Sequence, residues 1–278
     1  TQLSYSLTPS IICNTILRMT ERKDSSLAHQ TAVWGKYYEN RGVLSFSHTA
    51  HGYQSLINDT ASVLPDVVDA EAPRTFLLGG FHPYNGTPTA FLDFARAIHP
   101  NEGDIHILLD MNKEAVDAVP LAQSTTGIVS PLEQIDFREG SLDFVFVDFT
   151  TDFMSNEQIR EFAERVSVQL SERGILILVK KYLSAGRIVV SNNPDAPAFF
   201  PRSLREMLDL MSSLKPVGFL SEDFDGETFI AFTRRDSLIP EATPTEEHLT
   251  EELKKPGFSF RTAVSRPYYR TPSYYRIT

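Results

Sequence analysis

The chain has 278 residues, of which 41% are hydrophobic and 22% charged, as in an ordinary water-soluble globular protein. Its formal net charge of −10 disfavours nucleic-acid binding, because an acidic surface is repelled by phosphate backbones. Its apolar runs are too short to cross a membrane, and its single cysteine excludes a disulfide framework and a multi-cysteine metal site. The sequence shows no signal-peptide pattern, so a cytoplasmic location is expected.

Residues 1–72 have the pattern of amphipathic helices joined by loops. Ile12, Ile16 and Met19 recur at spacings of four and three, which place them on one face of a helix. The region also holds Trp34 and nearby tyrosines, for which the lining of an apolar substrate pocket and ordinary helix packing are equally good explanations. We therefore predict an N-terminal helical cap over residues 1–72.

A different pattern begins at residue 73 and continues to residue 236. Short apolar segments, which are typical of strands buried on both faces, alternate with segments of helical periodicity. This alternation predicts an α/β fold with a mostly parallel sheet flanked by helices. The last two strand segments meet at the turn "DFDG" and predict a terminal antiparallel hairpin, so about seven strands are expected. The predicted strands lie within 75–80, 103–110, 126–132, 141–150, 175–182 and 216–235.

Four segments between the predicted strands have helical periodicity and recognisable ends. Thr87 is a predicted N-cap, with Pro88 at the first helical position. Ser155 and Gln158 have the spacing of a capping box, and Gly174 is the predicted end of the same helix. The predicted helices lie within 87–98, 112–122, 155–174 and 201–214.

The α/β pattern stops after residue 236. Residues 237–278 are rich in proline, threonine and tyrosine, and after Glu252 they contain lysine and arginine but no acidic residue. Arginine and aromatic side chains are enriched at the centres of protein interfaces. We therefore predict an extended basic and aromatic tail that forms a dimer contact or binds a protein partner.

Five landmarks follow one another along residues 74–235: TFLLGG, HILLDMNKEAV, IVSPLEQIDFREGSLDFVFVDFTTDF, QLSERGILILVKKY and GFLSEDFDGETFIAFTRR. They correspond to a strand with a glycine turn, a strand ending in an acidic residue, a third and fourth strand, a helix leading to a fifth strand, and a closing hairpin. In this order they resemble the class I S-adenosylmethionine-dependent methyltransferases. The resemblance implies a Rossmann-like domain over residues 73–236, with S-adenosyl-L-methionine as the cofactor.

The resemblance also implies which residues would hold the cofactor. Ligands of open α/β sheets bind beyond the carboxyl ends of the strands, and the helix N-terminus after the glycine turn suits the methionine carboxylate. Asp110 would accept hydrogen bonds from the ribose hydroxyls, and the alternative is an ordinary turn or N-cap carboxylate. Ser130 or Glu133 would take the place of the adenine-binding residue, and the alternative is an ordinary loop. The expected cofactor-binding residues are Gly79, Gly80, Phe81, Asn85, Asp110, Met111, Ser130 and Asp148.

The glycine turn departs from the pattern of the family, which is acidic-x-Gly-x-Gly-x-Gly. Leu77 stands at the acidic position, and Phe81 and Pro83 stand at the later glycine positions. Two interpretations are open. In one, the turn is longer and its residues up to Gly86 line a cofactor pocket. In the other, bulky residues fill the turn and the pocket is lost.

The sequence thus predicts S-adenosylmethionine-dependent methyl transfer to a small or medium-sized acceptor. The cofactor would supply the electrophile, so few side chains need to react, and His82 and Tyr84 are the candidate catalytic residues. The alternative is a catalytically inactive methyltransferase-like protein that acts as a binding or regulatory partner. A different reaction at a retained cofactor pocket is a third hypothesis. No metal ligands are predicted.

Overall fold

The computed structural model describes the part of the chain that holds the predicted sheet. The described residues are 31–32, 72–81, 87–121, 124–148, 150–181, 200, 202–221, 227–239 and 241. The predicted cap and the predicted tail lie almost entirely outside these residues, so both stay predictions. None of the helices in the described part is long and apolar enough to span a membrane.

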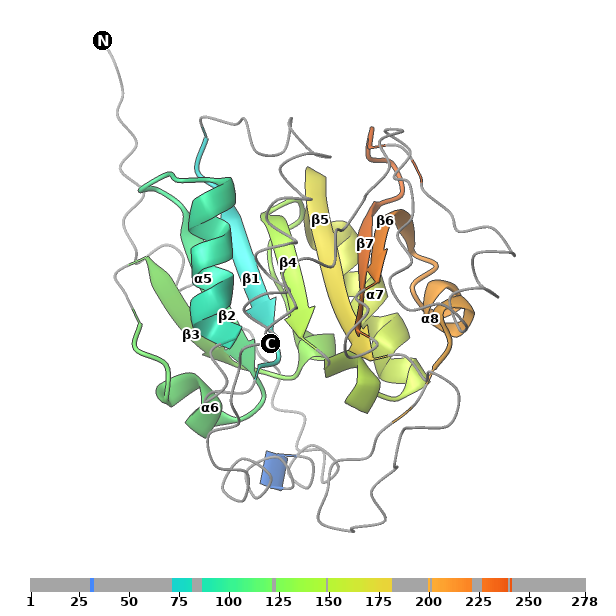
Figure 1. The fold of residues 1–278 in the computed structure, drawn as a ribbon, viewed down its shortest axis with the longest axis horizontal. Helices are drawn as coiled ribbons and strands as arrows, with labels where there is room; N and C mark the ends of the chain where they lie inside the picture. Colours follow the sequence, from blue (N-terminus) through green and yellow to red (C-terminus); the bar gives the residue numbers. More distant parts are fainter. Residues whose placement is uncertain are drawn as a thin grey trace, which may run out of the picture.

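Seven strands form one sheet in the order β3-β2-β1-β4-β5-β7-β6 (Figure 1). Strands β1 to β5 pair with their neighbours in parallel, whereas β7 is antiparallel to both β5 and β6. The prediction of a mostly parallel seven-stranded sheet with a terminal antiparallel hairpin is confirmed. The bounds are β1 Thr75–Gly79, β2 Ile105–Asp110, β3 Thr125–Val129, β4 Leu142–Asp148, β5 Leu170–Lys181, β6 Leu214–Ser221 and β7 Glu227–Arg234.

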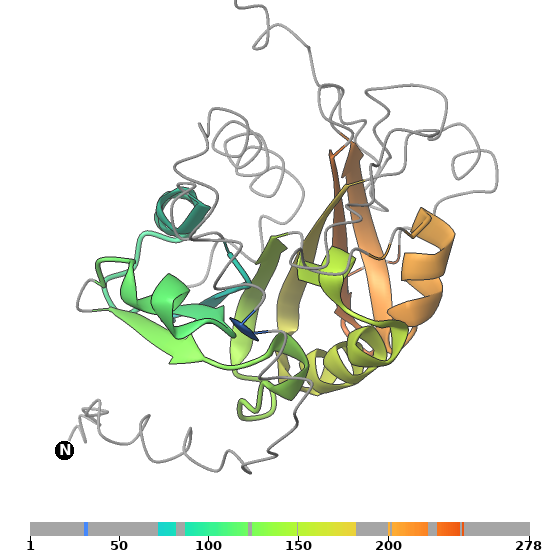
Figure 2. The same cartoon turned by 90° about the horizontal axis from the view of Figure 1, so that it is seen from below.

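Helices cover both faces of the sheet, as the alternation of strands and helices predicts. Helices α5 and α6 pack on one face, and α7 and α8 pack on the other (Figure 2). Two short 3₁₀ turns, η1 and η2, follow β3 and β4. The bounds are α5 Thr87–Ile98, α6 Lys113–Asp117, η1 Leu132–Gln134, η2 Thr150–Phe153, α7 Asn156–Gln169 and α8 Leu204–Leu210.

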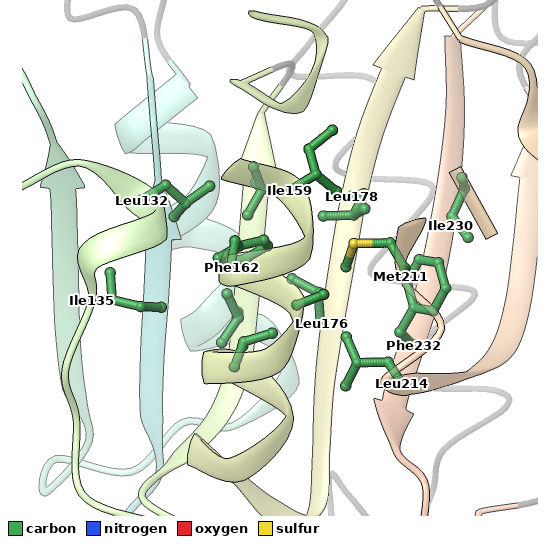
Figure 3. Packing of buried hydrophobic residues seen from close by; sticks show 14 of the residues in the cluster. Leu132, Ile135, Ile159, Phe162, Leu176, Leu178, Met211, Leu214, Ile230 and Phe232 are labelled. Carbon is green, nitrogen blue, oxygen red and sulfur yellow. The ribbon is translucent and has the colours of Figure 1, made fainter. Parts of the chain in front are cut away.

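The core consists of two hydrophobic clusters because each central strand is apolar on both faces. Alternate residues of β1 divide between them: Phe76 faces the cluster under α5, and Leu77 faces the cluster under α7. Aromatic rings dominate the first cluster, where the Phe76 and Phe144 ring centroids lie 5.2 Å apart. Aliphatic side chains around Phe162 dominate the second (Figure 3).

The predicted helix ends are only partly right. Ser155 and Gln158 form the expected capping box of α7, with Ser155 Oγ accepting from the Gln158 N–H at 3.2 Å. The predicted end at Gly174 is wrong, because Leu170 already pairs with Leu142 and begins β5. Gly174 lies inside that strand, where an added Cβ would stand 2.6 Å from the Leu142 carbonyl oxygen. Close strand packing, and not a helix terminus, requires this glycine.

At the amino edge of the sheet, two buried carboxylates contact basic side chains. Arg74 Nη1 lies 2.7 Å from Asp143 Oδ1, which also accepts a hydrogen bond from Ser171 Oγ at 2.9 Å. The buried His99 Nδ1 lies 2.8 Å from Asp104 Oδ2. Asp143 and Asp104, the two buried carboxylates named here, therefore each have a basic side chain beside them.

Candidate functional site

The candidate site lies where the carboxyl ends of β1, β2 and β4 meet, at the lower edge of the sheet in Figure 1. From β1 the chain continues outward through β2 and β3, and then returns to β4 on the other side of β1. Such a reversal of strand order is where open α/β sheets bind their ligands. The topology therefore brings together the glycine turn after β1, Asp110 at the end of β2 and Asp148 at the end of β4.

The glycine turn is tightly packed against the protein itself. Gly80 has a φ of +67° and its N–H donates to the Leu109 carbonyl at 2.7 Å. A Cβ added to Gly80 would stand 1.7 Å from Thr150 Oγ1, and one added to Gly79 would stand 2.6 Å from Leu132 Cδ1. Side chains from η1 and η2 thus fill the space that these glycines leave open.

Asp110 joins the glycine turn to the end of β2. Its Oδ2 accepts the Phe81 N–H at 3.1 Å, and its Oδ1 accepts the Asn112 N–H at 2.7 Å. Burial raises the pKa of Asp110 to about 6 from its ordinary value of 3.8, although both backbone N–H groups act in the opposite direction. An ionised carboxylate has about four acceptor positions, and the described residues occupy two of them.

Phe81 does not obstruct the turn with its ring. The sequence predicts crowding of a ligand by this bulky residue, but the side chain is only 3% exposed and packs in the cluster under α5. Its backbone N–H stays at the turn, where it contacts Asp110. The other predicted residues of the turn, His82, Tyr84 and Asn85, lie outside the described residues.

Asp148 and Thr87 bring the end of β4 to the start of α5. Thr87 Oγ1 donates to Asp148 Oδ2 at 3.0 Å, and both residues are buried. The helix spans Thr87–Ile98, the predicted range, and the Thr87 hydroxyl links its first residue to the end of β4. A carboxylate beside a helix N-terminus is stabilised by the positive end of the helix dipole.

Ser130 and Glu133 lie on the β3 side of Asp110. The Ser130 N–H donates to the Asp110 carbonyl at 3.0 Å, and its Oγ donates to the Pro131 carbonyl at 3.1 Å. Glu133 is buried and accepts a hydrogen bond from Gln158 Nε2 at 2.8 Å. Met111 follows Asp110 directly and is half-buried. These residues therefore border the same edge as Asp110, with the Ser130 and Glu133 side chains already engaged.

Two residues at this edge were not assigned a role from the sequence. Thr150 in η2 contacts the glycine turn, and Arg202 before α8 donates to the Thr151 carbonyl in the same 3₁₀ turn. Thr150 contacts Gly79 across 71 positions and Arg202 contacts Thr151 across 51, and neither residue belongs to a spacing motif. Only the assembled fold identifies them.

Comparison with known proteins supports the fold and adds no family assignment by sequence. No family model matches the chain, and no curated protein matches it. The solved structure of geranyl diphosphate C-methyltransferase from Streptomyces coelicolor, with Mg²⁺, geranyl diphosphate and S-adenosyl-L-homocysteine, matches with a TM-score of 0.51 at 13% identity. The match covers 74% of this chain and 98% of that one.

Other solved structures resemble the chain more weakly. A S-adenosylmethionine-dependent methyltransferase from Clostridium acetobutylicum matches at 8% identity with a TM-score of 0.49, over 66% of this chain and 90% of that one. LepI in complex with S-adenosylmethionine matches at 12% identity with a TM-score of 0.48, over 64% of this chain. The chain spans only 46% of the length of LepI.

The strand order and the Streptomyces match together define the fold. The sheet has five parallel strands and a closing antiparallel hairpin, and the Streptomyces methyltransferase matches the chain with a TM-score of 0.51. The chain therefore has the fold of the class I S-adenosylmethionine-dependent methyltransferases, as the order of its sequence landmarks predicts.

Proposed function

We propose that the chain binds S-adenosyl-L-methionine at the carboxyl edge of the sheet and transfers its methyl group to a small or medium-sized acceptor. The observation that carries this proposal is the buried carboxylate of Asp110 beside the glycine turn. Its raised pKa means that the described surroundings stabilise its charge less well than water does. A ligand with hydroxyl donors would supply what is missing.

The two carboxylates at this edge fit the cofactor in two respects. The ribose of the cofactor carries two adjacent hydroxyl groups, which match the two acceptor positions of Asp110 that the described residues leave open. The cofactor also carries an ammonium and a sulfonium group, and Asp148 places a second carboxylate at the same edge. Two carboxylates favour a cationic ligand over an anionic one.

The neighbouring structures support the same cofactor. The Streptomyces enzyme was solved with S-adenosyl-L-homocysteine, and LepI with S-adenosylmethionine. When bound, the cofactor would supply an activated methyl group, so this chain needs mainly to orient the acceptor and exclude water. His82 and Tyr84 are the proposed residues for accepting a proton from the acceptor.

Titration calorimetry with S-adenosylmethionine and S-adenosylhomocysteine tests the proposal. We expect micromolar binding to the full chain, weakened at least about tenfold in Asp110→Asn because hydrogen bonds to a charged acceptor are lost. Asp143→Asn is the matched control. Asp143 is also a buried carboxylate that accepts a backbone N–H, from Thr75 at 2.9 Å, but it lies at the amino edge. The control should lose stability and keep its affinity.

The pH dependence of binding gives a second signature of Asp110. Hydroxyl donors prefer the ionised carboxylate, so the affinity should rise as the pH increases through about 6, the pKa of Asp110. Binding near pH 6 should release a proton, which calorimetry detects by repeating the titration in buffers of different ionisation enthalpy. Asp110→Asn should abolish that release. Equal affinity in wild type and Asp110→Asn would refute the assignment of Asp110.

A second candidate function has one structural observation in its favour. Leu132 and Thr150 fill the space beside Gly79 and Gly80, and Asp110 accepts the Phe81 N–H, so the described part of the turn, Gly79–Phe81, is packed against the chain itself. This is the arrangement expected of an inactive methyltransferase-like protein that binds a partner. The absence of binding to either adenosyl compound would favour this candidate. Light scattering of the full chain and of residues 1–236 would then test the tail as a dimer or partner contact.

A further inference from the structure

The 3₁₀ turn η2 forms one wall of the glycine turn. Thr150 Oγ1 lies 3.3 Å from the Asp148 carbonyl oxygen and 3.5 Å from the Gly79 carbonyl oxygen. The Gly80 backbone approaches the same side chain so closely that no Cβ fits between them. The position of η2 therefore determines the space at the end of β1 and β4.

Arg202 donates hydrogen bonds to η2 and to the residues that follow it. This side chain is buried, with its residue only 4% exposed. Its Nη1 donates to the Thr151 carbonyl at 2.9 Å, and its Nη2 donates to the Met154 carbonyl. Its Nε donates to Asn156 Oδ1 at 2.8 Å, which extends the same set of bonds to the first residue of α7. One guanidinium thus fixes both ends of the η2 segment.

The segment before α8 is bound to η2 as well. The Phe200 N–H donates to the Asp152 carbonyl at 2.7 Å, and Arg202 Nη1 also donates to the Phe200 carbonyl at 3.2 Å. The Arg202 guanidinium carbon lies 5.4 Å from the centroid of the Phe200 ring. Residues 46 to 51 positions apart in sequence are therefore held together by one side chain.

The electrostatics of Arg202 argue against simple packing. Burial lowers the pKa of Arg202, and the nearby carboxylates of Asp152 and Glu206 counteract this effect. An apolar side chain would fill the same volume without that desolvation cost. A planar group with five fixed N–H donors instead specifies where each carbonyl must lie, which a lysine does not.

We propose that Arg202 is a positioning residue for the cofactor site: it holds η2, and through Thr150 the glycine turn, in the geometry that binds the cofactor. The proposal rests on the proposed function for its effect on binding. Its effect on the glycine turn does not depend on any ligand. Two measurements on the full chain test the effect on the glycine turn and the effect on cofactor binding separately.

The first measurement is hydrogen exchange of the ligand-free protein. Arg202→Met keeps the length and packing of the side chain but removes every donor. We expect faster exchange of the amides of residues 150–156 and of Gly79–Phe81 in this variant. Arg74→Met is the matched control, because Arg74 is a half-buried arginine bound to Asp143 at the amino edge. It should lower the melting temperature and leave exchange at Gly79–Phe81 unchanged.

The second measurement is calorimetric titration with S-adenosylhomocysteine. Arg202→Met should weaken binding at least about tenfold, and Arg202→Lys should recover part of the loss because an ammonium group can reach only some of the acceptors. Arg74→Met should bind within about twofold of wild type, a difference below 0.5 kcal/mol. Partial rescue by lysine is not expected of a residue that contributes only to global stability.

The outcomes distinguish failure of the Arg202 proposal from failure of the proposed function. Unchanged exchange at Gly79–Phe81 in Arg202→Met would overturn the proposal whatever the ligand does. Wild-type affinity in Arg202→Met, with tight binding to the wild type, would also overturn it. If the wild type binds no adenosyl compound, the proposed function fails, and Arg202 is judged by the exchange data alone.

Discussion

Asp110 at the carboxyl edge of the sheet differs from Asp143 and Asp104 at the amino edge in the groups that surround its carboxylate. At the amino edge, Asp143 pairs with Arg74 at 2.7 Å and Asp104 pairs with His99 at 2.8 Å. At the carboxyl edge, Asp110 accepts two backbone N–H groups and forms no ion pair among the described residues. The described residues place no basic side chain beside the Asp110 carboxylate, which is why we propose that this edge binds the ligand.

Each edge also has a glycine with a φ in the left-handed region, and the packing around these two glycines differs. Gly80, at the carboxyl edge, has a φ of +67° and Thr150 against its α-carbon. Gly140, in the turn before β4 at the amino edge, has a φ of +65° and nothing within 4 Å of an added Cβ. The backbone strain of a substitution is matched between them, and only the packing differs.

The largest effect should come from Gly80→Ala. The left-handed backbone and the overlap with Thr150 together should destabilise the fold by about 3–4 kcal/mol. Gly140→Ala should cost only about 1 kcal/mol, because it introduces the backbone strain alone. Urea unfolding of both variants measures the difference.

A second substitution that removes the overlap with Thr150 tests whether packing explains the difference between Gly80→Ala and Gly140→Ala. Thr150→Gly should recover part of the stability lost in Gly80→Ala, since it removes the atoms that the new Cβ meets. A Gly80→Ala variant no less stable than Gly140→Ala would show that the turn moves freely away from η2. The tight junction of β1 and β4 would then not define the site.

A smaller effect concerns stability against pH. The pKa of Asp110 is higher in the folded chain, about 6, than its ordinary value of 3.8, so the folded state binds this proton more tightly. Asp110 therefore contributes stability below about pH 4 and loses it as the pH rises through 6. The loss is at most about 3 kcal/mol for a shift of about two pKa units.

Asp110→Asn isolates this contribution because asparagine does not titrate. The lost acceptor oxygen gives a constant offset, whereas the free energy of unfolding of the variant relative to wild type should increase between pH 4 and pH 7. Urea titrations at several pH values provide the measurement. A difference that stays constant with pH would mean that the carboxylate is better solvated than its burial indicates, and the contrast between the edges would weaken.

Much of this arrangement could be predicted from the sequence because strands buried on both faces are almost wholly apolar. The run LDFVFVD predicts β4 for this reason, and Asp110 was expected at the end of β2 beside the glycine turn. The capping box at Ser155 was also predictable, since its bonds join residues three apart. Short sequence patterns thus predict contacts between residues that are close together in the chain.

Contacts between distant segments explain what the sequence did not predict. Gly174 has the local signature of a helix end, but pairing of Leu170 with Leu142 overrides it. Thr150 meets Gly79 across 71 positions, and Arg202 meets Thr151 across 51. No spacing rule relates such residues, so the contacts of η2 with the glycine turn can be identified only in the folded structure.

The smallest expected effect is on cofactor affinity when a helix cap is removed. It distinguishes the local hydrogen bonds of the caps from the long-range hydrogen bonds of Arg202. Ser155 and Ser203 cap α7 and α8 with equivalent capping boxes, on either side of the Arg202 contacts. Ser155→Ala and Ser203→Ala should each cost about 1 kcal/mol of stability. Their affinity for S-adenosylhomocysteine should stay within about twofold of wild type, because the carbonyls that Arg202 binds, those of Thr151, Met154 and Phe200, lie outside both capping boxes.

Thermal unfolding and calorimetry on the same samples distinguish the two kinds of support. If either capping variant loses as much affinity as Arg202→Met, the helix ends themselves position η2, and the guanidinium only follows them. If stability falls and affinity holds, the carboxyl edge contains two independent layers. One layer consists of local caps that contribute to folding, and the other is a long-range set of hydrogen bonds that shapes the site.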